Sequence, residues 1–175
     1  IVGVIEPGVR AAIAATRNGR IGVIGTSGTI RSGAYQNGIL ALLPDARVHS
    51  KACPLFVPLV EEGWTDTPVT RLVVEEYLKP YTGLQIDTLV LGCTHYPLLK
   101  PAIASLLGSG VTLVDSAIET AREVGLVLRR HKLAAGAGGA RRFDIILSDT
   151  SPTFAEIASR FLGRRAPEIE LVSVR

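Results

Sequence analysis

The chain alternates short runs of Val, Ile and Leu with segments that carry the apolar spacing of helices, and this alternation constrains the fold more than any other feature. The apolar runs are continuous rather than two-periodic, which is typical of strands buried on both faces of a parallel sheet. We therefore predict an α/β fold with largely parallel sheets. The expected strands are Ile1–Ile5, Arg20–Ile24, Arg47–Lys51, Ile86–Leu91, Val111–Val114, Phe143–Leu147 and Ile169–Val174.

The expected helices lie between these strands and are recognised by their ends. Pro7 suits the first turn of a helix, and Pro80 should stop the helix that Thr67 caps. Ser116 and Glu119 have the spacing of a capping box, which predicts the start of a further helix. The expected helices are Pro7–Thr16, Thr67–Pro80, Ser116–His131 and Pro152–Gly163.

Composition and charge exclude several classes of function. Of the 175 residues, 47% are hydrophobic and 20% are charged, which is enough apolar content for a packed core. The formal charge of +3 comes from mixed signs, and the arginine pairs are scattered without interleaved aromatic residues, so we expect no nucleic-acid partner. No apolar run is long enough to span a bilayer, so we expect no membrane partner. Two cysteines do not make a disulfide framework, so the expected location is cytoplasmic.

Ligands of α/β folds bind beyond the carboxyl ends of the strands, so the residues just after each strand are the candidates for chemistry. The run Gly25–Thr29 (Gly-Thr-Ser-Gly-Thr) follows one strand. Its hydroxyls and the N–H groups of the next helix would suit a phosphate or a carboxylate, although the run lacks the ending of a nucleotide P-loop. A turn whose hydroxyls merely cap the helix is the alternative. Asp115–Ser116 and Ser148–Asp149 also follow strands and are interpreted first as helix caps.

Cys93 lies at the carboxyl end of the strand Ile86–Leu91, in a Gly-Cys-Thr-His-Tyr-Pro run whose proline, Pro97, should begin a helix. A thiol at that place is close to the helix N-terminus and two residues from the imidazole of His95. Both neighbours would favour the thiolate, which is the reactive form of cysteine. The alternative is a structural cysteine, but that more often lies inside an apolar run. We favour a reactive thiol.

His95 is interpreted as an acid–base or charge-supplying partner of this thiol rather than as a core histidine. Its second ring nitrogen needs a partner, usually a carboxylate. Glu61 and Glu62 follow an apolar stretch that must be buried, so one of them could be drawn into a pocket. The alternative is a pair of solvated acids at the turn before Gly63.

A zinc site is a further alternative, because His49 with Cys53 and Cys93 with His95 would supply four ligands of the types that zinc takes. The spacings lack the close cysteine pairs of structural zinc sites, so we expect no metal. Cys53 is instead expected to pack as a small hydrophobic residue.

Taken together, these segments resemble the glutamate racemases of the cofactor-independent aspartate/glutamate racemase superfamily. The Cys-Thr-His-Tyr-Pro run is the most specific motif, and aspartate racemases share only a looser version of it. The resemblance runs in order from Ile1 to about Ala117 and more loosely to the end of the chain. The segments that carry it are Val2–Pro7, Ile24–Ile30, Ser32–Tyr35, Ala52–Gly63 and Leu91–Leu99.

The resemblance implies flavodoxin-like domains with parallel sheets and a reaction that interconverts L- and D-glutamate, supplying D-glutamate for bacterial peptidoglycan. The family uses two thiols, one on each face of the substrate α-carbon, and no cofactor or metal. One thiolate abstracts the α-proton while the other thiol donates a proton. Cys93 matches the second of the two catalytic cysteines, His95 the histidine that supports its thiol, and Glu61 the acid that partners this histidine. The positions that match substrate contacts are Thr94, His95, Thr26 and Thr29.

The other half of the family's site does not occur in this sequence: an Asp-Ser-Gly stretch, a Pro-Tyr-Gly stretch and a first cysteine in an Ala-Cys-Asn-Thr run. Cys53 cannot replace that cysteine, because its own motif matches elsewhere. The chain contains no methionine and begins at Ile1. We therefore expect a racemase without its N-terminal portion. Residues 1–4 would form a strand of an incomplete first domain, residues 5–115 the second domain, and residues 116–175 the C-terminal part of the first.

One thiol cannot invert a stereocentre by the two-thiol route, so we expect little or no racemisation by the chain alone. Three alternatives stay open: a racemase for another amino acid such as aspartate, a non-catalytic module that binds a dicarboxylate, and a zinc-stabilised domain. Pocket size bears on the first, calorimetry with glutamate on the second, and elemental analysis on the third. The resemblance leaves a homodimer open, because dimer arrangements vary within the family.

Overall fold

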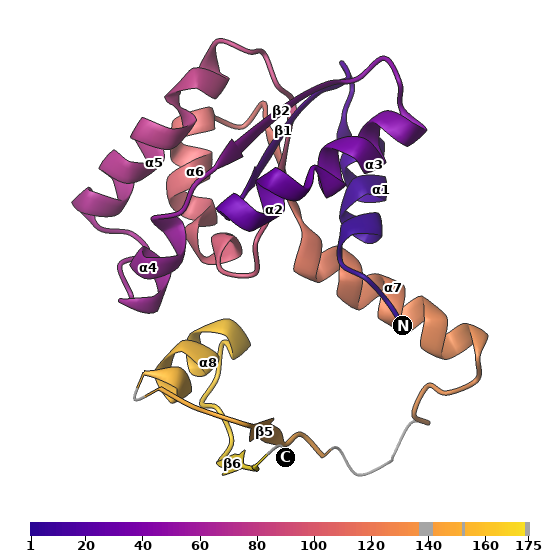
Figure 1. Cartoon of the computed structure of the whole chain (residues 1–175), viewed down its shortest axis with the longest axis vertical. Coiled ribbons are helices and arrows are strands. Elements are labelled where there is room, and N and C mark those ends of the chain that lie inside the picture. Colours follow the sequence, from indigo (N-terminus) through magenta and orange to yellow (C-terminus); the bar gives the residue numbers. More distant parts are fainter. Residues whose placement is uncertain (137–141, 152, 174–175) are drawn as a thin grey trace. The chain divides into compact units, whose positions relative to one another are not determined.

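The computed structural model describes residues 1–136, 142–151 and 153–173, which form two compact units, Ile1–Leu133 and Ala134–Arg175. The first unit is built on a parallel sheet of four strands in the order β2-β1-β3-β4 (Figure 1). Its strands are β1 (Arg20–Gly25), β2 (Arg47–Ala52), β3 (Thr88–Gly92) and β4 (Thr112–Asp115). These four follow the predicted runs to within two residues at each end, so the prediction of an α/β fold with a parallel sheet is confirmed.

Helices cover both faces of this sheet, as the continuous apolar strands require. On β3, Leu89 and Leu91 face one hydrophobic core while Val90, between them, faces the other. Helices α4, α5 and α6 pack on the first of these faces, and α1 and α3 on the second (Figure 1). The helices of this unit are α1 (Ile5–Ala15), α2 (Ser27–Ser32), α3 (Ala34–Leu42), α4 (Phe56–Glu61), α5 (Pro68–Thr82), the 3₁₀ helix η1 (Tyr96–Leu99), α6 (Lys100–Leu107) and α7 (Ser116–Arg130).

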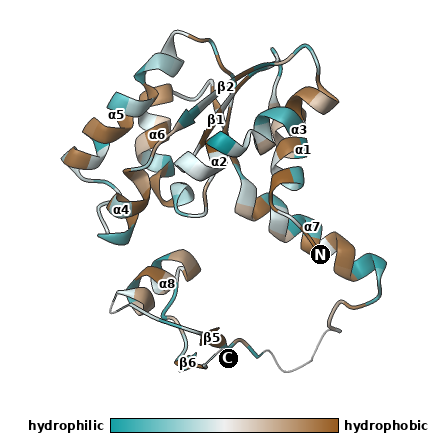
Figure 2. Cartoon of the chain, in the orientation of Figure 1, coloured by the Kyte–Doolittle hydropathy of each residue, from teal (hydrophilic) through white to brown (hydrophobic). Residues whose placement is uncertain are grey.

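The second unit consists of α8 (Phe154–Leu162) and two short parallel strands, β5 (Ile145–Leu147) and β6 (Ile169–Leu171). Gly163 ends α8 in the left-handed conformation, φ 62°, which is where a glycine was expected. Hydrophobic residues occur on the helices of both units, α8 included (Figure 2). The expected helix start at Pro152 and the expected strand end at Val174 lie outside the described residues.

The prediction of a strand at the N-terminus is wrong. Residues 1–4 form no strand, and α1 begins at Ile5, two residues before Pro7. An apolar run becomes a strand only where another strand offers hydrogen bonds, and no described strand pairs with these residues. The acidic Glu6 and Pro7 in the first turn favour a helix start instead.

Two predicted helix boundaries also need correction. Helix α5 does not stop at Pro80 but continues to Thr82, because a proline so close to the C-terminal end removes a single hydrogen bond. The cap of α7 is Asp115 rather than Ser116, since its carboxylate accepts from the N–H groups of Ala117 and Ile118. Ser116 is the first residue inside the helix, so the capping box with Glu119 does not form.

The first unit ends at Leu133, whereas the predicted domain boundary lies between residues 115 and 116. Helix α7 belongs to this unit because it packs on α1, where Arg10 Nη2 lies 2.8 Å from Glu123 Oε2. The assignment of residues 1–4 and 116–175 to an incomplete first domain stays a prediction. No helix of the described residues combines the length and hydropathy that a membrane span requires.

Candidate active site

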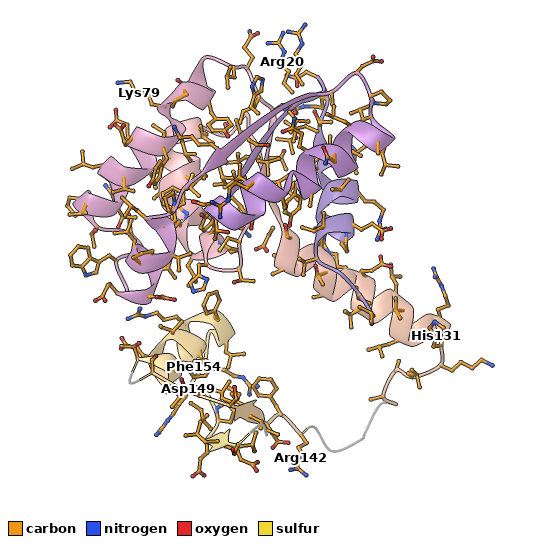
Figure 3. The ribbon with its side chains drawn as sticks, viewed as in Figure 1. Arg20, Lys79, His131, Arg142, Asp149 and Phe154 are labelled. Atoms are coloured by element: carbon orange, nitrogen blue, oxygen red, sulfur yellow. The ribbon has the colours of Figure 1, made fainter. Side chains whose placement is uncertain are left out.

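The pairing of β1 with β3 brings two predicted site segments to one edge of the sheet. Gly25 at the end of β1 lies in register with Gly92 at the end of β3, so Thr26 and Cys93 follow neighbouring strand ends. The approach is close, because a Cβ on Gly25 would lie only 3.1 Å from Thr29 Cβ and 3.4 Å from the Gly92 carbonyl oxygen. Arg20 marks the opposite, amino-terminal edge of the sheet (Figure 3).

The hydroxyl groups of the turn after β1 cap the helix that follows. Thr26 Oγ1 accepts from Thr29 N at 3.3 Å, and the two threonine hydroxyl oxygens are 3.0 Å apart. The capping interpretation is therefore confirmed, while a role in ligand binding stays a prediction. Both threonines are half-buried and Ser27 between them is exposed.

Cys93 is half-buried, and its Sγ lies 4.0 Å from Nδ1 of His95. Burial raises the pKa of the Cys93 thiol above its ordinary value. The backbone N–H groups of His95 and Tyr96 and the hydroxyl of Thr94 act in the opposite direction on this pKa but do not outweigh burial. The sequence argument considered only the stabilising neighbours and did not include burial, which has the larger effect on this pKa.

Glu61, the last residue of α4, lies beside His95. Its Oε1 is 3.4 Å from His95 Nε2, while Thr94 Oγ1 is 3.3 Å from Nδ1 of the same ring. The structure thus brings Cys93, Thr94 and Glu61 into contact with the His95 ring. The imidazole lies between the thiol and the carboxylate. The side chain of Glu61 is 51% exposed, so it contacts the imidazole from the solvent side rather than from a buried pocket.

The loop that carries Cys93 is fixed on its far side by Tyr96. The Tyr96 hydroxyl donates to the Cys53 carbonyl oxygen at 2.8 Å, and its ring packs edge to face on Phe56 with centroids 5.1 Å apart. Cys53 itself is fully buried, and burial raises the pKa of its thiol to about 12. It packs as a small hydrophobic residue, as predicted.

The zinc alternative gains no support from the geometry of the described residues, among which no group of three or more His, Cys, Asp or Glu side chains could hold a metal ion. The helix cap predicted at Ser148–Asp149 does not form, because Asp149 accepts from Thr150 N and α8 begins after Thr153 (Figure 3). The interval between strand and helix is too long for a cap from these residues.

A pocket of about 520 Å³ opens beside Cys93 within the first unit. Small and apolar side chains of α7 form one wall, and Tyr35 and Ser116 form part of the lining. Sequence reasoning did not include Tyr35 or Ser116 among the predicted site residues. Tyr35 was recognised only as part of a motif, and Ser116 was interpreted as a cap. The complete lining is Val4, Tyr35, Gly92, Cys93, Thr94, Ser116, Ala117, Thr120, Ala121 and Val124.

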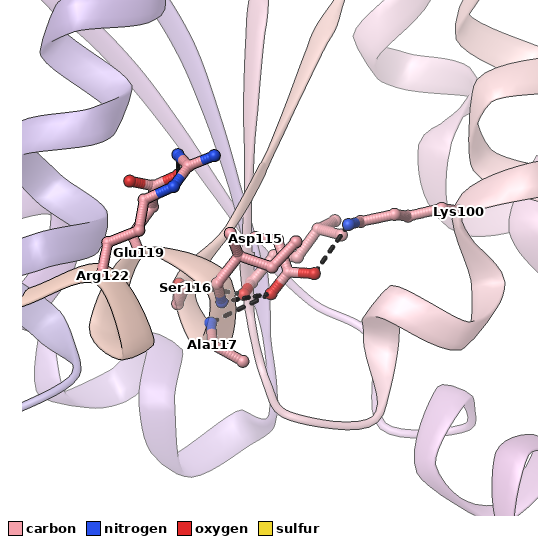
Figure 4. A network of polar contacts seen from close by, with 8 residues as sticks. Lys100, Asp115, Ser116, Ala117, Glu119 and Arg122 are labelled. Atoms are coloured by element: carbon pink, nitrogen blue, oxygen red, sulfur yellow. Dashed lines mark hydrogen bonds and ion pairs between the residues drawn. The ribbon is translucent and has the colours of Figure 1, made fainter. Parts of the chain in front are cut away.

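Asp115 stabilises the wall formed by α7. One carboxylate oxygen caps the helix, and the other lies 2.6 Å from the Lys100 ammonium group at the start of α6 (Figure 4). The side chain of Asp115 is 8% exposed and that of Lys100 32%. Because α6 follows the Cys93 loop through η1, this ion pair connects the loop to the pocket wall.

The chain is similar to known proteins in both sequence and structure. A family model described as Asp/Glu/Hydantoin racemase matches residues 1–124. The chain is 49% identical to a glutamate racemase of Geobacter metallireducens and 49% identical to one of Neisseria meningitidis, in each case over 99% of the chain and 64% of the relative. It therefore spans about 64% of the length of the curated relatives that it matches.

Solved structures give the same picture. Glutamate racemase isoform RacE1 of Bacillus anthracis superposes with a TM-score of 0.88 at 41% identity, over 99% of the chain and 64% of that protein. A glutamate racemase of Francisella tularensis, solved in complex with D-glutamate, also gives a TM-score of 0.88 at 32% identity, over 98% of the chain and 63% of that protein.

Proposed function

The chain belongs to the Asp/Glu/Hydantoin racemase family, and we propose that it carries one half of a two-thiol site that interconverts L- and D-glutamate. The observation that supports this most directly is the place of Cys93. Its thiol lines a pocket of about 520 Å³, and an imidazole lies 4.0 Å from the sulfur. The hydroxyl turn follows the end of the neighbouring strand, but Thr26 and Thr29 are not among the residues that line this pocket. A dicarboxylic amino acid needs such a setting, with hydroxyl donors near a single reactive atom.

In this proposal the Cys93 thiolate takes the α-proton from one enantiomer. An S–H bond forms, the Cα–H bond breaks, and its electron pair moves into the substrate carboxylate. A second thiol then donates its proton to the opposite face of Cα, which inverts the centre. The raised pKa of Cys93 is consistent with this role, because a thiolate of higher pKa is a stronger base towards a weakly acidic C–H group.

His95 and Glu61 would hold the thiol in its working state. The imidazole lies between Sγ and the Glu61 carboxylate, so a proton on Nε2 would be shared with Glu61 while Nδ1 faces the sulfur. Thr94, Thr26 and Thr29 would contact the substrate through their hydroxyl groups. Hydrogen bonds to the substrate carboxylate gain most where negative charge grows during proton abstraction.

The remaining parts of the proposal concern the whole protein. The second thiol would come from polypeptide that corresponds to the part of the relatives that this chain does not cover, and residues 116–175 would complete that domain. We expect the full protein to supply D-glutamate for peptidoglycan in the cytoplasm. Sequencing the coding region upstream of Ile1 for the Asp-Ser-Gly and Ala-Cys-Asn-Thr stretches tests this assignment directly.

Hydrogen exchange at the substrate tests the role of Cys93 in the chain itself. A single thiolate can remove the α-proton, exchange it with solvent and return it to the same face. The chain in D₂O should therefore replace the Cα–H of one glutamate enantiomer by deuterium, without forming the other. Loss of the Cα–H signal in the NMR spectrum measures this. We expect Cys93→Ala to abolish the exchange, and the rate to rise with pH because the thiolate is required.

Cys53→Ala is the matched control, since it also removes one thiol but from a fully buried place. It should leave the exchange unchanged. Wild-type chain without exchange, or exchange that survives Cys93→Ala, would contradict the proposal. Rapid formation of D-glutamate from L-glutamate by the chain alone would contradict the part of the proposal that takes the second thiol from polypeptide outside this chain. Aspartate in place of glutamate tests the substrate, and we expect slower exchange with it.

A further inference from the structure

Two buried hydrogen bonds join α3, α7 and β3 close to Cys93 in the chain. The Tyr35 hydroxyl of α3 donates to Ser116 Oγ of α7 at 2.8 Å, and Ser116 Oγ donates to the Leu91 carbonyl oxygen of β3 at 3.1 Å. Tyr35 is 3% exposed, Ser116 7% and Leu91 not at all. Buried hydroxyl groups that satisfy one another in this way hold their elements at a defined separation.

The ring of Tyr35 makes a second contact with the same segment. Gly92 lies between this ring and the main chain of β1, and a Cβ on Gly92 would be 2.9 Å from the Ile24 carbonyl oxygen and 3.0 Å from the Tyr35 ring. The peptide unit that precedes Cys93 is therefore enclosed on both sides. Tyr35, Ser116, Gly92 and Cys93 all line the same pocket.

We propose that Tyr35 and Ser116 are positioning residues, which fix the Leu91–Gly92 backbone so that the Cys93 thiol faces the pocket and the N–H groups of its own loop. The proposal rests on the proposed function of Cys93 as the reactive thiol. It assigns no contact with substrate to the Tyr35 hydroxyl, because that group is occupied by Ser116.

The consequence is a specific change in the acid–base behaviour of Cys93. The N–H groups of His95 and Tyr96 and the hydroxyl of Thr94 stabilise the Cys93 thiolate, and each depends on where the sulfur lies. The other titratable groups around the sulfur are the His95 ring, with Glu61 behind it, and the phenols of Tyr35 and Tyr96. Burial raises the pKa of both phenols.

The rate at which iodoacetamide alkylates Cys93, measured across pH by mass spectrometry, tests the proposal in the whole chain. We expect Tyr35→Phe and Ser116→Ala each to lower this rate about threefold to tenfold near neutral pH, with the midpoint of the profile moved to higher pH. The reason is that a displaced sulfur loses N–H contacts that favour its charged form.

Tyr81→Phe is the matched control. Tyr81 is also 3% exposed and its hydroxyl also donates to a main-chain carbonyl, that of His49, but its ring lies beside Gly22, near the start of β1. This variant should leave the Cys93 profile unchanged. Unchanged profiles in both Tyr35→Phe and Ser116→Ala, or an equal shift in Tyr81→Phe, would overturn the proposal.

Cys53 reports the folded state in the same experiment, because its fully buried thiol reacts only when the chain opens. A variant in which Cys53 reacts as fast as Cys93 has lost the fold, and the other variant then decides the outcome. The measurement uses no glutamate. Failure of the exchange experiment would therefore leave this result interpretable, and failure here would leave the role of Cys93 as a base intact.

Discussion

The two compact units of the chain differ in how they bury their apolar residues. The first unit has two cores, one on each face of its four-stranded sheet. In the second unit, no described residue is buried, and Ile146, Phe161 and Leu171 are each more than 40% exposed. Two short strands and one helix cannot enclose a core, and a two-stranded sheet is marginal without a packing partner.

This difference places the stability of the chain and its proposed site in the same unit. Every residue proposed for the reaction lies in the first unit, as does the pocket of about 520 Å³. The edge that carries Cys93 is thus supported by the well-packed part of the molecule. We expect the free energy of unfolding to come almost entirely from the first unit, and the predictions below test that expectation with matched substitutions.

The largest difference in stability is expected between substitutions of one phenylalanine in each unit. Phe56→Ala removes a fully buried ring that contacts Tyr77 and Tyr96, and should lower the free energy of unfolding by about 3–5 kcal/mol. Phe143→Ala removes a ring that is 49% exposed and should cost less than about 1 kcal/mol. Urea unfolding followed by circular dichroism measures both. Equal costs would show that the second unit has a core of its own.

A smaller effect is expected from buried and exposed carboxylates. Asp87 is 6% exposed and accepts from Thr16 Oγ1 at 2.7 Å, from Arg17 N at 2.6 Å and from Asn18 N at 2.8 Å. Burial by itself would raise the pKa of Asp87, but these hydrogen bonds outweigh it and the pKa is lowered. Asp87→Asn should therefore cost about 1–3 kcal/mol at neutral pH, measured by urea unfolding.

The pH dependence of that cost follows from the sign of the shift. A folded-state pKa below the unfolded value of about 3.9 gives stability that is present above that value and lost as pH falls through the folded-state pKa. The difference between wild type and Asp87→Asn should shrink over this acidic range. Asp149→Asn in the second unit is the control and should have no measurable cost. A difference independent of pH would assign the effect to shape rather than charge.

Much of the first unit could be predicted from the sequence, because its central strands β1 and β3 are buried along most of their length and need no partner information to be recognised. The strand predicted at residues 1–5 failed for the opposite reason: strand formation there depends on a neighbour, which the apolar pattern does not encode. The placement of Thr26 and Cys93 after neighbouring strand ends was predictable, since the carboxyl ends of parallel strands share one edge.

Other features of the site depend on packing and had no sequence signal. The hydrogen bond from Tyr35 to Ser116 joins residues 81 positions apart, on two helices whose separation only the folded sheet determines. The raised pKa of the Cys93 thiol was not predicted, for the same reason. Local neighbours of the thiol could be read from the sequence, but burial could not, and burial has the larger effect.

The smallest expected effect concerns the attachment of α7 to α1 within the first unit. Arg10 of α1 and Glu123 of α7 form an ion pair at 2.8 Å with side chains 43% and 27% exposed, whereas Arg142 and Asp144 form a more exposed pair in the second unit. Glu123→Gln should cost about 0.2–1 kcal/mol in urea unfolding, and the cost should fall at high salt, because screening weakens partly exposed pairs. Asp144→Asn should cost nothing measurable. A cost for Glu123→Gln no greater than that for Asp144→Asn would mean that this ion pair does not help to hold α7 on the first unit, and the attachment of α7 would then depend on apolar packing alone.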